Sequence, residues 1–202
     1  MIEFEGDSGE YEFLIQAVEM SKGVDGLCLE IGLRLGKGTA TIIDAVSQFC
    51  PDKKVVAVDP YGSILYEGRE GQICRLDYTN DMRNTCLANM YPYSQEKGVK
   101  FHFIELTDKD FFDLYATGVI IYDLERHLIN KYSMVHLDGP HNVKDLLHEI
   151  SWFNLRMDAG AVIVLDDITP DFFDLEPVEA LLFQCGWGVV KKGNKKGLYI
   201  KN

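Results

Sequence analysis

Clustered positive charge is the first thing that this sequence lacks. Its 202 residues contain 20 Lys and Arg against 32 Asp and Glu, for a net charge of −12. Nucleic-acid binding depends on Lys and Arg clusters that neutralise phosphates, so we expect no nucleic-acid partner. The longest basic feature is a stretch near the C-terminus, which we interpret as a solvated turn: Lys191, Lys192, Lys195 and Lys196.

Cysteine patterns and long apolar runs are also missing. The five cysteines are odd in number and contain no CxxC pair, which argues against a disulfide framework or a zinc knuckle. Cys28 lies in an apolar run and is interpreted as a small core residue, and reduced thiols fit a cytoplasmic location. No segment is apolar enough to span a membrane, and the first residues lack the features of a signal peptide. We therefore expect a cytoplasmic protein without a membrane partner.

What the chain does contain is an alternation of short apolar runs and amphipathic segments. Helices are expected at 8–21, 39–49, 143–157 and Pro177–Gly186. Asp7 and Glu10 have the spacing of a capping box for the first of these helices. The alternation predicts a doubly wound, Rossmann-like α/β fold with helices on both faces of a mostly parallel seven-stranded sheet. A C-terminal antiparallel hairpin closes this sheet. Its strands are expected at 27–31, 55–58, 99–104, 134–137, 161–165, 188–192 and 198–201.

Two stretches, 61–98 and 108–131, interrupt this alternation. The first contains five tyrosines, which can line a substrate pocket or cover a sheet edge, and we give these two interpretations equal weight. The second can form a lid, a helix or a dimer contact, so a homo-oligomer stays open. No linker or repeat divides the chain, and we expect one domain over 1–202 with an N-terminal helix within 1–25.

Carboxylates follow several of the predicted strands, where each apolar run ends: Glu30, Asp59, Asp138, Asp166 and Asp167. In a doubly wound sheet the carboxyl ends of the parallel strands share one edge, and ligands bind there. Uncompensated negative charge does not stabilise a core. We therefore expect a cationic group at this edge: a metal ion, a positively charged cofactor, or both.

A glycine-rich loop joins the first strand to the second helix, and it contains Gly32, Gly36 and Gly38. The dinucleotide-binding pattern GxGxxG fails because Arg34 stands at the second glycine position, and the Walker A pattern fails as well. Glycines still allow a tight turn and a close approach between backbone and ligand. An acidic residue after the second strand, here Asp59, is the usual partner of ribose hydroxyls in such folds.

These motifs together resemble a known family. ExGxxxGxGT after the first strand, DPY after the second, DGPH after the fourth and DD after the fifth are similar to class I S-adenosylmethionine-dependent methyltransferases. The likeness is strongest to metal-dependent small-molecule O-methyltransferases of the catechol and macrocin type, and it covers about residues 26–168. The resemblance implies that Gly32, Gly36 and Gly38 shape the pocket for the methionine part of the cofactor. It implies cofactor contacts from the acidic and hydroxyl side chains Glu30, Asp59, Glu105 and Thr107.

The same resemblance implies a divalent metal, expected to be Mg²⁺, at Asp138, Asp166 and Asp167. Oxygen ligands suit such a hard cation, although one or two of these carboxylates can instead cap the following segment. His141 follows Asp138 by three residues, and an imidazole can remove a hydroxyl proton near neutral pH. The alternative for His141 is a capping role. We interpret His136 as a core or supporting residue.

The sequence therefore predicts methyl transfer from S-adenosylmethionine to a hydroxyl of a small-molecule acceptor, assisted by a metal. Pro140 departs from the more common DGDH form. Two alternatives remain: a metal-independent methyltransferase for an amine or a carboxylate, and a non-catalytic cofactor-binding module of the same fold. Fold alone does not decide among them.

Overall fold

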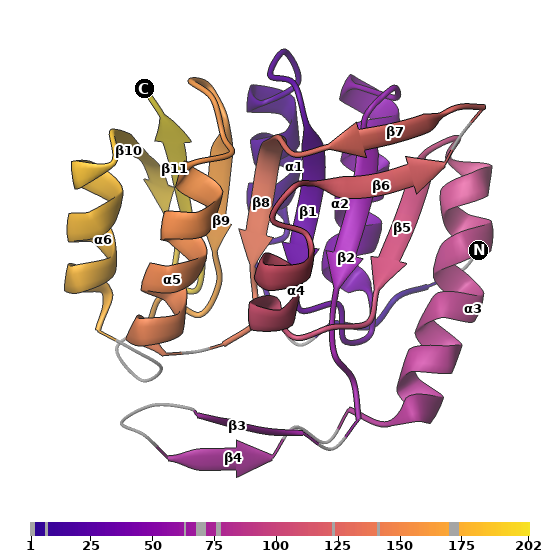
Figure 1. The fold of residues 1–202 in the computed structure, drawn as a ribbon, viewed down its shortest axis with the longest axis horizontal. Coiled ribbons are helices and arrows are strands. Elements are labelled where there is room, and N and C mark those ends of the chain that lie inside the picture. Colours follow the sequence, from indigo (N-terminus) through magenta and orange to yellow (C-terminus); the bar gives the residue numbers. More distant parts are fainter. Residues whose placement is uncertain are drawn as a thin grey trace.

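The computed structural model describes residues 3–6, 8–62, 64–67, 72–75, 78–122, 124–140, 142–169 and 174–202. Its centre is a seven-stranded sheet in the order β10-β11-β9-β8-β1-β2-β5, which confirms the predicted fold (Figure 1). β11 pairs antiparallel with both β10 and β9, and the other neighbouring strands of this sheet pair in parallel. The strands are β1 (Leu27–Ile31), β2 (Lys54–Val58), β5 (Lys100–Ile104), β8 (Tyr132–Leu137), β9 (Val162–Leu165), β10 (Trp187–Lys192) and β11 (Gly197–Lys201).

The strand order reverses at β1, which pairs in parallel with β2 on one side and with β8 on the other. The chain moves outward from β1 through β2 to β5, then returns to the other side of β1 with β8. At such a switch point the loops after neighbouring strands diverge and leave a crevice. The arrowheads of β1, β2, β5 and β8 point to the same edge in Figure 1, so residues that follow these strands meet there.

Helices cover both faces of the sheet (Figure 1). One face carries α1 (Glu12–Met20), α2 (Lys37–Phe49) and α3 (Asn80–Glu96), and the other carries α4 (Asp108–Leu114), α5 (Val143–Asn154) and α6 (Leu175–Gln184). Among the described residues, none of the helices has the length and apolar composition that crossing a bilayer requires.

The start of α1 differs from the prediction. The helix begins at Glu12, its N-cap Tyr11 makes no side-chain capping bond, and Asp7 lies outside the described residues. The capping-box prediction is wrong for Glu10, because this residue has a φ of 58° and its carboxylate accepts backbone N–H groups of residues 194–196. A contact between the two ends of the chain has thus replaced a local cap.

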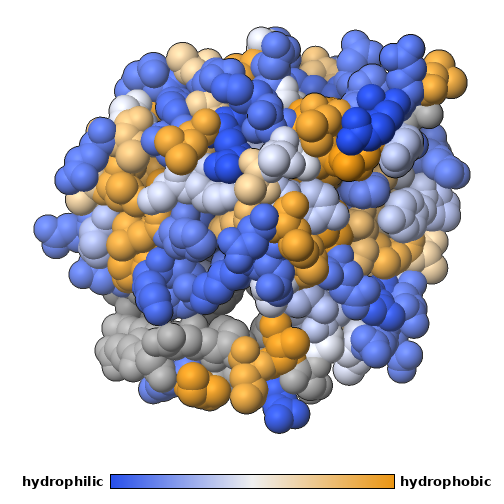
Figure 2. Space-filling model, in the orientation of Figure 1, coloured by the Kyte–Doolittle hydropathy of each residue, from blue (hydrophilic) through white to orange (hydrophobic). Residues whose placement is uncertain are grey.

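The two interrupting stretches form small elements outside the main sheet. The first contains the hairpin β3 (Leu65–Glu67) and β4 (Ile73–Arg75), which lies below the carboxyl edge in Figure 1, followed by α3. Hydrophobic side chains are exposed over this hairpin (Figure 2). The second contains α4 and the hairpin β6 (Val119–Tyr122) and β7 (Arg126–Ile129), which lies near the amino ends of β1 and β2.

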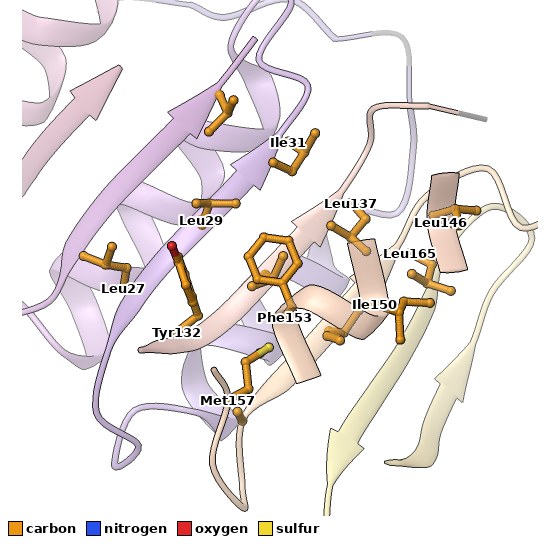
Figure 3. Close-up of a cluster of buried hydrophobic side chains, with 14 of the residues drawn as sticks. Leu27, Leu29, Ile31, Tyr132, Leu137, Leu146, Ile150, Phe153, Met157 and Leu165 are labelled. Atoms are coloured by element: carbon orange, nitrogen blue, oxygen red, sulfur yellow. The ribbon is translucent and has the colours of Figure 1, made fainter. Parts of the chain in front are cut away.

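Two hydrophobic clusters, one on each face, hold the helices against the sheet. Figure 3 shows the first, in which Phe153 of α5 faces Leu29 of β1 and Tyr132 of β8. All five residues of β1 are buried, as expected for a central parallel strand. Each fully buried leucine or isoleucine in such a cluster stabilises the fold by about 1.5–3 kcal/mol. The strand that carries Glu30 is therefore rigidly placed.

Candidate active site

A cavity of about 560 Å³ lies at the carboxyl edge of the sheet. Its walls come from the ends of β1, β2, β8 and β9, the loop before α2, the segment around β3, the start of α4 and the β10–β11 turn. This volume is typical of small-molecule sites. The cavity brings together nine of the predicted site residues: Glu30, Gly32, Gly36, Gly38, Asp59, Thr107, Asp138, Asp166 and Asp167.

Glu30 is a buried carboxylate in the middle of β1 and is held by two side chains. Its Oε1 lies 2.7 Å from Nδ1 of His136 on β8, and its Oε2 accepts a hydrogen bond from the hydroxyl of Thr39 on α2. A Cβ on Gly38 would lie 2.0 Å from Oε1 of Glu30. Glycine at position 38 is therefore what lets the start of α2 approach this carboxylate.

Gly32 and Gly36 have left-handed backbone conformations, with φ of 96° and 90°. A Cβ on Gly32 would lie 2.1 Å from the carbonyl oxygen of Asp138, where the loop after β1 crosses the end of β8. A Cβ on Gly36 would lie 2.7 Å from Cε of Met90 on α3. Both glycines thus fix the shape of the loop through contacts with protein atoms. Their contact with a cofactor stays a prediction.

Asp59 follows β2 and organises the same loop from the other side. Its oxygens accept the backbone N–H of Arg34 at 2.9 Å and of Tyr61 at 2.8 Å. Burial raises the pKa of Asp59, although these backbone hydrogen bonds act in the opposite direction. Tyr61 is buried and donates its hydroxyl to the carbonyl of Arg34. The carboxylate is therefore placed at the cavity wall with a fixed orientation.

The two remaining cofactor predictions fall in different places. Glu105 is exposed, forms an ion pair with Arg83, and is not among the residues that line the cavity. Thr107 does line the cavity, and its hydroxyl oxygen caps α4 by accepting the N–H of Asp110 at 3.1 Å. Of these two residues, only Thr107 is placed to contact a molecule in the cavity.

Asp138, Asp166 and Asp167 come together at the ends of β8 and β9, as predicted. A hydrogen bond joins the carboxyl groups of Asp138 and Asp166. Burial and the neighbouring Asp166 raise the pKa of Asp138 well above its usual range. Burial acts to raise the pKa of Asp166 too, but the neighbouring His136 and Lys196, together with the hydrogen bond from Lys196, hold it well below its usual range. Of the two carboxyl groups, Asp138 is therefore the one that holds a proton more tightly, and Asp166 is the one that ionises first.

Lys196 is the main functional residue that the sequence analysis missed. Its side chain is fully buried, so the interpretation of this stretch as a solvated turn is wrong at this position. Its Nζ lies 2.7 Å from Oδ1 of Asp166 and 3.3 Å from Nε2 of His136. An ammonium only donates, so Nε2 must accept and Nδ1 of His136 carries the proton that Glu30 accepts. His136 is thus the supporting residue that the sequence analysis expected.

A further buried acid, Glu149, lies on α5 behind the cavity wall. Glu149 is fully buried, and among the described residues neither of its carboxylate oxygens has a hydrogen-bond partner. Burial, followed by the nearby charges of Asp108 and Asp145, raises the pKa of Glu149 well above its usual range. Amphipathic spacing alone did not distinguish this position from a solvent-facing one.

His141, the predicted base, lies outside the described residues. Its neighbours are described: Pro140 lines the cavity, and Asn142 is the N-cap of α5, with its side chain accepting the N–H of Asp145 at 2.9 Å. The role of His141 therefore stays a prediction.

One of the predicted metal-ligand atoms is already engaged by groups of the protein itself. Oδ1 of Asp166 already accepts hydrogen bonds from Lys196, from the hydroxyl of Ser8 at 3.1 Å and from the N–H of Asp167 at 2.9 Å. Mg²⁺ and Ca²⁺ need several oxygen ligands free to coordinate them. A different group, Glu30, His136 and Asp138, offers ligand atoms within 4.8 Å of one another. Both ring nitrogens of His136 are engaged, however, by Glu30 and Lys196.

Comparison with known proteins identifies the class of this fold and site. Residues 29–168 match the family model described as a methyltransferase domain. The match spans most of the chain, and the protein belongs to this family. A search of curated protein sequences gave no match.

Solved structures of methyltransferases share the fold at low sequence identity. CalS11, a calicheamicin methyltransferase, has a TM-score of 0.67 and 9% identity over 94% of this chain and 77% of its own. The O-methyltransferase TomG from Streptomyces achromogenes, in complex with S-adenosylmethionine, has a TM-score of 0.64 and 14% identity over 98% of this chain and 82% of its own. An O-methyltransferase from Bacillus cereus, in complex with S-adenosylhomocysteine, has a TM-score of 0.61 and 13% identity over 99% of this chain and 84% of its own. The fold is that of class I S-adenosylmethionine-dependent methyltransferases.

Proposed function

We propose that this methyltransferase transfers a methyl group from S-adenosylmethionine to a hydroxyl of a small-molecule acceptor. The observation that carries the proposal is the single cavity in which Glu30, the glycine loop and Asp59 meet at the switch point of the sheet. Two of the solved structures with this fold are complexes with S-adenosylmethionine or S-adenosylhomocysteine. The acidic surface of the chain favours a small molecule over a nucleic acid as acceptor.

The cofactor site would be formed by this edge of the sheet. Asp59 is the residue to accept hydrogen bonds from ribose hydroxyls, because its orientation is fixed by the backbone of Arg34 and Tyr61. Glu30 and the loop through Gly38 would hold the methionine part. When bound, the cofactor supplies an electrophilic methyl group on a sulfonium. The protein aligns the acceptor with this methyl group and excludes water.

We assign proton removal from the acceptor to His141, the next residue in the sequence after Pro140, which lines the cavity. An imidazole with a pKa near neutrality can take the proton as the acceptor oxygen attacks. His141→Ala is expected to lower kcat while S-adenosylhomocysteine binds as in the wild type. His127→Ala, on β7, is the matched control, because β7 lies near the opposite end of the sheet.

Metal assistance, predicted with Asp138, Asp166 and Asp167 as ligands, is the weaker part of the sequence-based hypothesis. The ion pair between Lys196 and Asp166 favours the alternative of a metal-independent methyltransferase. Methyl transfer to any acceptor found by screening, measured with EDTA and with Mg²⁺, separates these alternatives. Cofactor binding without methyl transfer to any acceptor class would instead favour a non-catalytic module.

Calorimetric titration with S-adenosylhomocysteine tests the cofactor site. The wild type is expected to bind, and Asp59→Ala is expected to bind at least about tenfold more weakly, since a lost hydrogen bond to a charged group costs about 1.5–3 kcal/mol. Asp52→Ala is the control, because Asp52 is an exposed acid at the opposite end of β2. Equal affinity in a folded Asp59→Ala variant would remove the ribose assignment.

A further inference from the structure

The β10–β11 turn is held in place by the opposite end of the chain. The carboxylate of Glu10 accepts the backbone N–H groups of Asn194 at 2.7 Å, and of Lys195 and Lys196 at 2.9 Å each. A Cβ on Gly193 would lie 2.3 Å from this carboxylate, so the two segments are in close contact. The backbone of Lys196 is therefore fixed independently of its side chain.

The side chain of Lys196 enters the interior at the carboxyl edge of the sheet, where all of its N–H donors have acceptors. Its Nζ has three partners within hydrogen-bonding distance: Asp166 at 2.7 Å, the hydroxyl of Ser8 at 3.0 Å and Nε2 of His136 at 3.3 Å. An ammonium has three N–H donors, so each donor has one acceptor. These three acceptors offset the cost of burying the ammonium charge at this position.

The same three contacts place a positive charge between the strand-end carboxylates. Lys196 contacts Asp166 directly and reaches Glu30 through His136. Asp166 in turn is hydrogen-bonded to Asp138. The ammonium thus lies at the position where the sequence analysis expected a cationic group. A divalent ion coordinated to Oδ1 of Asp166 would have to displace this ammonium or be repelled by it.

We propose that Lys196 is the resident cation of this site and takes the place of a divalent metal ion. It acts as a positioning residue: it holds Asp166 and, through His136, Glu30, and it makes the site independent of added metal. The proposal rests on the proposed function only for its activity measurement, because metal binding is measured separately. Acceptor selection then falls to side chains that line the cavity, among them Lys195, Asp138 and Asp167, without chelation of neighbouring hydroxyls.

Titration of Mn²⁺ into the EDTA-treated full-length protein, followed by the electron paramagnetic resonance signal of free Mn²⁺, tests the proposal. The wild type is expected to leave the signal of free Mn²⁺ unchanged. Lys196→Met, which keeps the length of the side chain and removes its charge, is expected to bind Mn²⁺ and to gain thermal stability from it. Lys192→Met is the matched control, because Lys192 belongs to the same hairpin but forms an exposed ion pair with Glu179. This control is expected to behave like the wild type.

Binding of one Mn²⁺ per wild-type chain, lost in Asp166→Asn and kept in Lys192→Met, would overturn the proposal. A folded Lys196→Met variant that binds Mn²⁺ no better than the wild type would overturn it too. If Lys196→Met does not fold, the wild-type titration decides the question alone. Methyl transfer that is equal with EDTA and with Mg²⁺ supports the proposal, and loss of transfer in EDTA contradicts it. Failure of S-adenosylhomocysteine to bind refutes the proposed function and leaves the Mn²⁺ result unaffected.

Discussion

Replacement of Gly38 by alanine sets two opposing effects against each other. Gly38 is the second residue of α2, and its φ lies outside the left-handed region, so the backbone can accept alanine. In an exposed helix this change would stabilise the protein by about 1 kcal/mol. Here the new Cβ would lie 2.0 Å from Oε1 and 3.0 Å from Cδ of Glu30. The carboxylate must therefore move.

Movement of Glu30 breaks its contacts with His136, at 2.7 Å, and with Thr39. Hydrogen bonds to a charged group contribute about 1.5–3 kcal/mol each, so the loss is about 3–6 kcal/mol. Subtraction of the helix-propensity gain leaves a net destabilisation of about 2–5 kcal/mol. The steric effect wins by this reasoning. If Glu30 also contacts the cofactor, the affinity for S-adenosylhomocysteine falls by at least about tenfold.

Urea denaturation and calorimetric titration of the Gly38→Ala variant measure both effects. Gly9→Ala is the control, since a Cβ there would meet nothing within 4 Å. Glu30→Asp withdraws the carboxylate by one methylene, so the double variant should lose less stability than the sum of the two single losses. A Gly38→Ala variant with wild-type stability and affinity would refute the idea that this glycine makes room for Glu30.

Three further predictions concern stability. Between the ordinary pKa of a glutamate, 4.5, and the raised pKa of Glu149, the folded protein binds more protons than the unfolded chain, so stability falls as pH rises through this window. Urea denaturation should show Glu149→Gln gaining stability relative to the wild type from pH 4.5 upward, and a constant difference across pH would contradict the assignment. Glu10→Ala should lower the free energy of unfolding by about 1–3 kcal/mol, because three backbone N–H groups lose their acceptor, while exposed Glu19→Ala should change it little. Gly36→Val should destabilise by about 1–3 kcal/mol or more, because its Cβ would lie 2.7 Å from Met90, and a stable variant with an unchanged melting temperature would be evidence against this close packing.

The sheet could be predicted from the sequence because its signals are local. A continuous apolar run marks a strand buried on both faces, and the predicted bounds of β1 agree with the structure residue for residue. The start of α1 could not be predicted in this way. Asp7 and Glu10 have the spacing of a capping box, but Glu10 binds a turn 184 residues or more away along the chain. A long-range contact of this kind leaves no periodic pattern in either segment.

The site could be predicted in outline for the same reason. Parallel strands bring their carboxyl ends to one edge, so Glu30, Asp59 and Asp138 could be placed together before any coordinates were known. The partners of these carboxylates could not. Lys196 stands in a stretch that reads as a polar hairpin turn, and its burial depends on Ser8 and Glu10 at the other end of the chain.

The expectation of a metal ion rested on one physical premise, that clustered carboxylates at a buried edge need positive charge from outside the protein. The structure weakens this premise residue by residue. The pKa of Asp138 is raised by burial and by Asp166, Asp166 pairs with Lys196, and Asp59 accepts two backbone N–H groups. Glu30 accepts from the hydroxyl of Thr39 and from His136. Glu30, Asp59 and Asp166 are thus each compensated by different groups of the chain itself. An acidic cluster at strand ends therefore predicts a cation, but a single buried lysine from a distant turn can provide it.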